Sequence, residues 1–218
     1  RQLREEEMER LLVLLEARFR KMLAAQIEVY EKTQELDKAQ ENAPVHELEI
    51  AGGRLRRQEE PLVRQADQAL MLLREDGTST AFPEALRQAR ADMETIARRL
   101  GEVKTGLITQ SLEEDVIAAL EETLAALQQA LADLREQQSN PQQGSGQPGE
   151  QQLVDRLAEL RMIRSLQVRV NRRTERYGAL IEGEQAYEEE LIEALELLAE
   201  REARILEATH DLHTGENR

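Results

Sequence analysis

The sequence predicts an all-α protein, an elongated antiparallel coiled coil or helical bundle of about five helices. Only 2% of the 218 residues are aromatic and 33% are charged, a composition typical of long helices. Apolar residues also advance in alternating steps of four and three, which is the seven-residue repeat of a coiled-coil seam. Such a chain buries narrow stripes rather than one thick core, so we expect a single elongated domain.

The first predicted helix spans residues 2 to about 41. Pro44 ends it, because proline lacks a backbone N–H and disfavours helical geometry in the residue before it. Its seam contains the residues Met8, Leu12, Leu15, Phe19, Met22, Gln26, Val29, Thr33 and Leu36.

Three further helices are predicted at about 46–75, 83–104 and 112–138. The first contains Gly52, Gly53 and Pro61, near one of which we expect a bend or fraying. Gly77 suits a left-handed C-terminal cap, and Pro83 suits the first turn of the next helix. Ser111 and Glu114 have the spacing of a capping box, although the same segment can be a kink in a continuing helix.

Residues 139–150 are rich in Gly, Gln, Pro and Ser and predict a flexible loop. From there to the end, 151–218, the apolar pattern predicts one very long helix of roughly 90 Å, packed on the rest of the chain. Gly178 and Gly183 are its weakest points. We find no convincing strand.

Polar residues recur on the predicted seams. When the sequence is aligned with itself at a shift of 141 residues, Gln26 matches Gln167, Val29 matches Val170 and Thr33 matches Thr174. In a weaker third copy, Glu202, Ile205 and Thr209 correspond to Gln26, Val29 and Thr33. The match indicates an internal duplication of a helix pair.

Polar seam residues predict a registration device. A polar side chain there lowers stability unless it finds a hydrogen-bonding partner, so facing Gln or Thr pairs favour one alignment of the helices. Gln26, Thr33, Gln167, Thr174 and Thr209 would set this register. Chance or drift in a Gln- and Glu-rich helical chain is the alternative explanation.

Charge and composition disfavour several functions. The net charge of −15 repels a polyanion, and there is no aromatic platform for bases, so we expect no nucleic-acid binding. No run of 18 apolar residues exists, so we expect no membrane span. Arg172, Arg173 and Arg176 form a basic patch that can dock an acidic partner, including a Glu-rich helix of this chain, or can be an ordinary mix of helix charges.

The sequence also predicts neither a metal site nor a cofactor. Glu207 and His210 have the spacing of a di-iron helical bundle, but such bundles need two of these pairs. The simpler interpretation is that this histidine lies on the surface near a helix end. Clustered glutamates indicate solvated helix faces. Gly52 and Gly53 lack the strand and the Lys of a phosphate loop. We therefore expect no enzyme activity.

Four segments resemble an uncharacterised family of long-helical bacterial proteins that is associated with planctomycete-type genomes. They are "EARFRKMLAAQIEVYEKTQELD", "LREDGTSTAFPEAL", "LITQSLEEDVIAALEE" and "LRMIRSLQVRVNRRTERY". The resemblance implies an exported protein encoded near biopolymer-transport proton channels of the ExbB and TolQ kind. The sequence begins at Arg1 rather than Met, which suggests that a leader or an anchor precedes it.

These observations predict a non-enzymatic scaffold, spacer or tether that mediates protein–protein association in the periplasm or cell envelope. Its partner would be a second copy, another helical protein or a membrane proton-channel complex. Two alternatives remain, the coiled-coil arm of a larger cytoplasmic ATPase and a helical-bundle metal enzyme.

Overall fold

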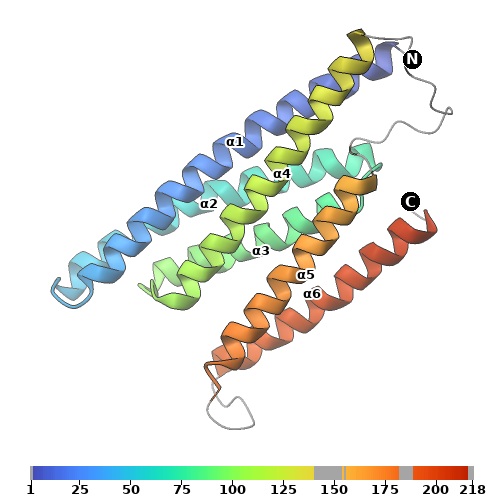
Figure 1. Cartoon of the computed structure of the whole chain (residues 1–218). Helices are drawn as coiled ribbons and strands as arrows, with labels where there is room; N and C mark the ends of the chain where they lie inside the picture. The colour runs from blue at the N-terminus through green and yellow to red at the C-terminus, as the bar shows by residue number, and fades with distance from the viewer. Residues whose placement is uncertain (1, 140–153, 155, 182–188, 216–218) are drawn as a thin grey trace.

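The computed structural model describes residues 2–139, 154, 156–181 and 189–215, and these residues form six α-helices (Figure 1). They are α1 (Gln2–Ala39), α2 (Val45–Asp76), α3 (Ala81–Gly101), α4 (Leu107–Ser139), α5 (Arg156–Gly178) and α6 (Glu189–Thr214). The predicted all-α helical bundle is confirmed.

The first four helices form an antiparallel four-helix bundle. α1 contacts α2 and α4, and α3 contacts the same two helices from the opposite corner. The apolar seam predicted for the first helix faces the centre of this bundle. Leu12, Leu15, Phe19 and Met22 are all at most 1% exposed. Burial of these side chains contributes roughly 1.5–3 kcal/mol each to folding.

Several helix ends lie close to the local signals that the sequence contains. The chain turns at residues 40–44, and Pro44 occupies the N-cap position of α2. α2 ends at Gly77, whose φ of 67° is left-handed and whose N–H donates to the carbonyl of Leu73. Pro83 lies in the first turn of α3. Local residue chemistry therefore determines where these helices begin and end.

α2 is one helix through Gly52, Gly53 and Pro61. Gly52 has a packing role, because a Cβ atom there would lie 2.5 Å from the carbonyl oxygen of Leu100 in α3. The backbones of α2 and α3 approach closely at this point, and only glycine permits that distance.

The capping box predicted at Ser111 and Glu114 is wrong. α4 begins earlier, at Leu107, and the Ser111 hydroxyl donates to the carbonyl of Ile108 inside the helix at 2.9 Å. The helix starts earlier because Thr105 and Gln110 bind Asp37 of α1, at 2.8 and 3.1 Å, and hold the α3–α4 turn against that helix.

The prediction of five helices with one very long C-terminal helix is also wrong. α5 ends at Gly178, where Ala179, Leu180 and Ile181 donate backbone hydrogen bonds to carbonyls three or four residues before them. α6 then packs back along α5. A glycine at the break lowers helix propensity, and a second helix lying against α3 buries more apolar surface than a projecting one would. Gly183 and the predicted loop at 139–150, apart from Ser139, lie outside the described residues.

The hairpin of α5 and α6 covers the side of α3 and α4 that faces away from α1 and α2 (Figure 1). α3 is consequently in contact with α2, α4, α5 and α6. Its polar residues Glu84, Gln88, Asp92 and Arg99 are all less than 9% exposed. This central position of α3 creates the polar contacts described next.

Candidate functional site

Gln26 and Thr33, predicted to set the register, are both fully buried at the centre of the four-helix bundle. The Gln26 amide donates to Glu59 of α2 at 3.2 Å. The Thr33 hydroxyl lies 2.7 Å from a carboxyl oxygen of Glu113 in α4 and 3.0 Å from the carbonyl of Val29. Their partners are thus glutamates on two other helices rather than a second Gln or Thr.

Glu59 and Glu113 form a buried carboxyl pair, and both are 0% exposed. Burial raises the pKa of Glu59 to about 8, and the charge of Glu113 adds to this effect. Burial likewise raises the pKa of Glu113 to about 7, against the opposing hydrogen bond from Thr33. Both shifts favour the neutral form, because burial disfavours a charged carboxylate that has no cation beside it.

Three atoms of this group have no hydrogen-bonding partner in the described part of the chain. They are Oε1 of Gln26, Oε1 of Glu59 and Oε2 of Glu113. A buried polar atom without a partner costs roughly 1–3 kcal/mol. The group therefore lowers the stability of the bundle, and its hydrogen bonds join α1 to α2 and to α4.

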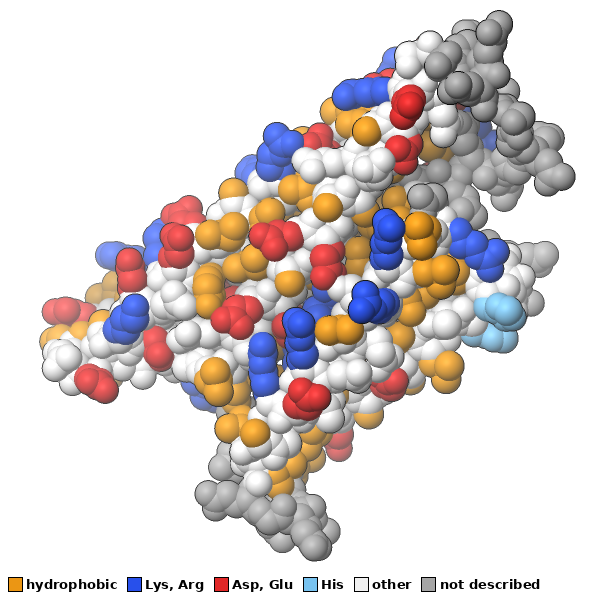
Figure 2. All heavy atoms as spheres, in the orientation of Figure 1, with side chains coloured by type: hydrophobic (Ala, Val, Ile, Leu, Met, Phe, Trp, Pro, Cys, Tyr) orange, Lys and Arg blue, Asp and Glu red, His pale blue; other side chains and the backbone are white. Residues whose placement is uncertain are grey.

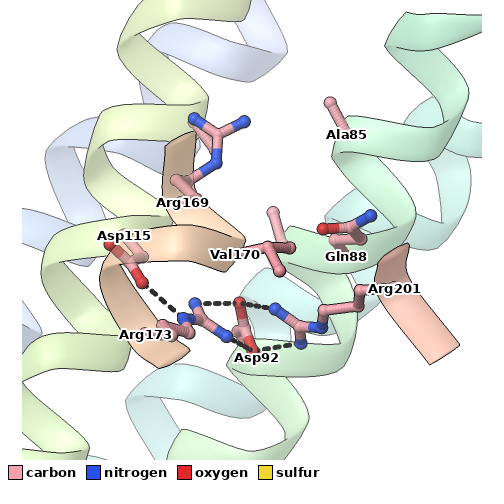
Figure 3. Close-up of a pocket in the computed structure, with 10 residues that line it drawn as sticks. Ala85, Gln88, Asp92, Asp115, Arg169, Val170, Arg173 and Arg201 are labelled. Atoms are coloured by element: carbon pink, nitrogen blue, oxygen red, sulfur yellow. Dashed lines mark hydrogen bonds and ion pairs between the residues drawn. The ribbon is translucent and has the colours of Figure 1, made fainter. Parts of the chain in front are cut away.

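A second polar cluster joins the C-terminal hairpin to the bundle. We call Asp92, Asp115, Arg173 and Arg201 the ion cluster; its members come from α3, α4, α5 and α6, and each is at most 7% exposed. Figure 3 shows Arg173 and Arg201 approaching Asp92 from opposite sides. Three helices thus meet at the Asp92 carboxylate, and Arg173 links α4 to them through Asp115.

Each arginine of the ion cluster binds Asp92 with two nitrogen atoms. Arg173 donates to the two carboxylate oxygens at 2.9 and 2.6 Å, and Arg201 donates from Nη1 at 3.1 Å and also from Nη2. Arg173 additionally donates to Asp115. Two parallel bonds between a guanidinium and a carboxylate fix orientation as well as distance.

In the ion cluster, the opposite charges of neighbouring groups shift the pKa values more than burial does. Burial alone would raise the pKa of Asp92, but the two guanidinium groups lower it to about 2. For Arg173, burial acts to lower the pKa, and the charges of Asp92 and Asp115 raise it above its ordinary value. Both shifts favour the charged forms of Asp92 and Arg173. The cavity beside the cluster measures only about 10 Å³, room for at most one water molecule.

Glu159 provides a second attachment between the hairpin and the bundle. This buried residue of α5 accepts hydrogen bonds from the backbone N–H groups of Thr80 and Ala81, at 3.0 and 2.6 Å, and from the Ser79 hydroxyl. A carboxylate at a helix N-terminus satisfies free N–H groups and opposes the helix dipole. The start of α3 is therefore capped by a side chain from another helix.

The three arginines of the predicted basic patch have different surroundings in the structure. Arg173 is buried in the ion cluster, Arg172 is exposed, and Arg176 lies 3.8 Å from Glu114 of α4. In Figure 2 a row of basic side chains follows α5 beside acidic side chains of α4. Arg173 thus docks onto acidic residues of helices in the same chain, one of the two interpretations that the sequence allowed.

The remaining predicted register residues lie on the second hairpin. Gln167 is half-buried and donates to Glu202 of α6 at 2.8 Å. Thr174 and Thr209 are exposed, and their hydroxyls donate to the carbonyls of Val170 and Ile205 in their own helices. The structure thus brings Gln167 into an interhelical contact, and in the described residues it places neither threonine in one.

The hairpin of α5 and α6 has a side that the bundle does not cover. We define its outer face by Leu160, Ile163, Gln167, Leu195, Glu202 and Leu206. Leu160 is 48% and Leu206 is 72% exposed, Glu202 is exposed, and the other three are partly buried at the edge of the core. These residues recur at helical spacings, and the contact between Gln167 and Glu202 joins the two rows. Residues on the opposite side of α5, such as Met162 and Leu166, pack against the bundle.

Sequence reasoning missed Glu59, Asp92, Asp115, Glu159 and Arg201. It interpreted Glu113 as part of a solvated helix face, which is wrong because this side chain is 0% exposed. Each of these is a charged residue three or four positions from a buried apolar residue, as Glu59 is from Leu55 and Leu62. Charge at a seam position is therefore the signal that indicates these sites.

Glu207 and His210 are exposed side chains of α6. Across the described ranges, no three His, Cys, Asp or Glu side chains come together in a group that could hold a metal ion. Among the helices that the structure describes, none combines the length and apolar character that crossing a membrane requires.

Comparison with known protein families, curated proteins and solved structures finds no significant match to this chain.

Proposed function

We propose that this chain is a non-enzymatic helical scaffold that mediates protein–protein association through its second hairpin. The observation that supports this function is the contrast between the two sides of that hairpin. One side is fixed to α3 and α4 by the ion cluster and by Glu159, whereas the outer face exposes Leu160 and Leu206. A rigidly held, partly apolar helix face is the usual form of an interaction surface.

We also propose that the second hairpin is a duplicate of the first. Each hairpin carries a Gln of its first helix bound to a Glu of its second, Gln26 to Glu59 and Gln167 to Glu202. A shift of 143 residues additionally places buried apolar residues of α2 on buried apolar residues of α6. These pairs are Leu48 with Leu191, Leu55 with Leu198, Leu62 with Ile205, and Ala69 with Leu212.

The same proposal assigns the scaffold to the cell envelope. Support for this location comes from the resemblance to an exported family of long-helical proteins. Fractionation of cells that encode the chain tests it: recovery in the periplasmic or envelope fraction supports the location, and recovery with the cytosol overturns it.

The scaffold function is tested by light-activated cross-linking. A photoreactive amino acid replaces Leu206 in the full chain, and cells that encode the chain are illuminated. Met71, an apolar residue of α2 that is 63% exposed and lies off the second hairpin, is the matched control position. Cross-linking to protein at position 206 and not at position 71 supports the proposal, and equal labelling or no labelling at the two positions contradicts it.

A further inference from the structure

We propose that the outer face binds the outer face of a second copy of this chain, so that two C-terminal hairpins form a four-helix bundle between the chains. This inference deepens the scaffold function, on which it rests, by naming the partner. It depends on three features, which are the exposure of the face, its counterpart in the first hairpin and the distribution of charge.

Most of the counterpart of the outer face in the first hairpin is covered, and Val63, which corresponds to Leu206, is half-buried. Under the proposed duplication, Leu160, Ile163 and Gln167 correspond to Phe19, Met22 and Gln26, each 0% exposed. In the second helix of each hairpin, Glu202 corresponds to Glu59, which is also 0% exposed, whereas Glu202 is exposed.

What covers the first hairpin is another antiparallel helix pair, α3 and α4. The second hairpin contacts this same pair with its opposite side, through Leu166 and Arg173. Its outer face therefore retains the pattern of a surface that packs on a helix hairpin, but in the described chain no hairpin covers it. An antiparallel helix pair is the shape that fits this pattern.

The charges of α5 and α6 favour the hairpin of a second copy as the helix pair that covers the outer face. Among the exposed side chains that the structure describes, α5 carries four arginines and one glutamate, whereas α6 carries six glutamates and no arginine. A twofold axis parallel to the helices places α5 of one chain opposite α6 of the other, so that each basic helix faces an acidic one. The face is thus complementary to itself.

Other symmetric arrangements are less favourable. A twofold axis perpendicular to the helices would place α5 against α5 and α6 against α6, which brings like charges together. Arg164 of α5 and Glu207 of α6 are both exposed, and they distinguish the two arrangements. In the favoured arrangement they come from helices that face each other across the axis.

The test is the mass of the purified full chain by sedimentation equilibrium over a wide concentration range. We expect a reversible dimer of twice the 24.9 kDa of one chain, and we expect salt to weaken it. Leu206→Glu, which places a charge at an exposed position of the face, should raise the dissociation constant at least about tenfold. The matched variant Met71→Glu, on α2, should leave it unchanged.

A charge exchange tests the arrangement. Arg164→Glu and Glu207→Arg should each weaken the dimer, and the variant with both changes should recover most of the affinity. Additive weakening overturns the pairing of α5 with α6, and a monomer at every concentration overturns the inference. If position 206 then cross-links in cells to a different protein, the scaffold function stands and only the second copy is excluded.

Discussion

Replacement of Glu59 by Gln tests whether the buried carboxyl pair makes the bundle sensitive to pH. The pKa of Glu59 is about 8 in the folded chain, against 4.5 for an unperturbed carboxyl. Between these values the folded state holds a proton that the unfolded state has released. The stability from a raised carboxyl pKa is complete below pH 4.5 and is lost as the pH rises toward 8.

The magnitude follows from about 1.36 kcal/mol per pH unit of difference in proton binding. From pH 5 to pH 8 the contribution of Glu59 changes by about 3 kcal/mol, which is lost from the free energy of unfolding. Glu113, with its pKa of about 7, contributes further in the same direction. Glu59→Gln removes the Glu59 part, and the new amide can donate to the unpartnered Oε1 of Gln26.

The assay is urea unfolding followed by circular dichroism at several pH values from 5 to 8. The advantage of Glu59→Gln over the natural chain should grow by about 3 kcal/mol across this range. The matched control is Glu121→Gln, at an exposed position of α4, which should follow the natural chain. An unchanged pH dependence in Glu59→Gln would refute the view that a buried, protonated Glu59 lies in this core.

Three further changes have definite expectations. Asp92→Asn removes the shared charge of the ion cluster and should lower the free energy of unfolding by about 3–5 kcal/mol, measured by urea unfolding; a loss within the fitting error would contradict the cluster. Gly52→Ala places a Cβ atom 2.5 Å from a carbonyl oxygen and should lower the free energy of unfolding by about 1–3 kcal/mol. Gly53→Ala, whose Cβ atom has its nearest contact at 3.8 Å, should raise the free energy of unfolding by about 0.5–1 kcal/mol. A change of the same sign in both variants would refute the close approach of α2 and α3. Glu159→Ala should cost about 1–2 kcal/mol and increase amide hydrogen exchange at the start of α3 more than elsewhere, and uniform exchange would exclude a cap.

The sequence predicted those parts of the fold that local chemistry determines. The seam of α1, the turn at Pro44 and the cap at Gly77 each depend on a few neighbouring residues, so their positions could be read from the chain. The break after Gly178 could not, because it depends on whether α6 gains more by packing on α3 than by continuing α5.

The polar contacts divide in the same way. Gln26 and Thr33 were found because a polar residue interrupts an apolar repeat. The ion cluster was not found, because Asp92 meets partners 81 and 109 residues away, and no local pattern indicates which distant arginine will reach it. Arg173 was noticed as a surface charge, yet its function depends on being buried beside an acidic residue of another helix.

The capping of α3 by Glu159 has a consequence for the order in which the chain is made. α1 to α4 are synthesised before α5, so the newly made bundle has free N–H groups at the start of α3 and an unpaired Asp92 on its side. These groups remain hydrated until the second hairpin emerges, and a hydrated acidic group on that side opposes premature association with other apolar surfaces. Capping of α3 is therefore delayed until Glu159 of α5 has been made.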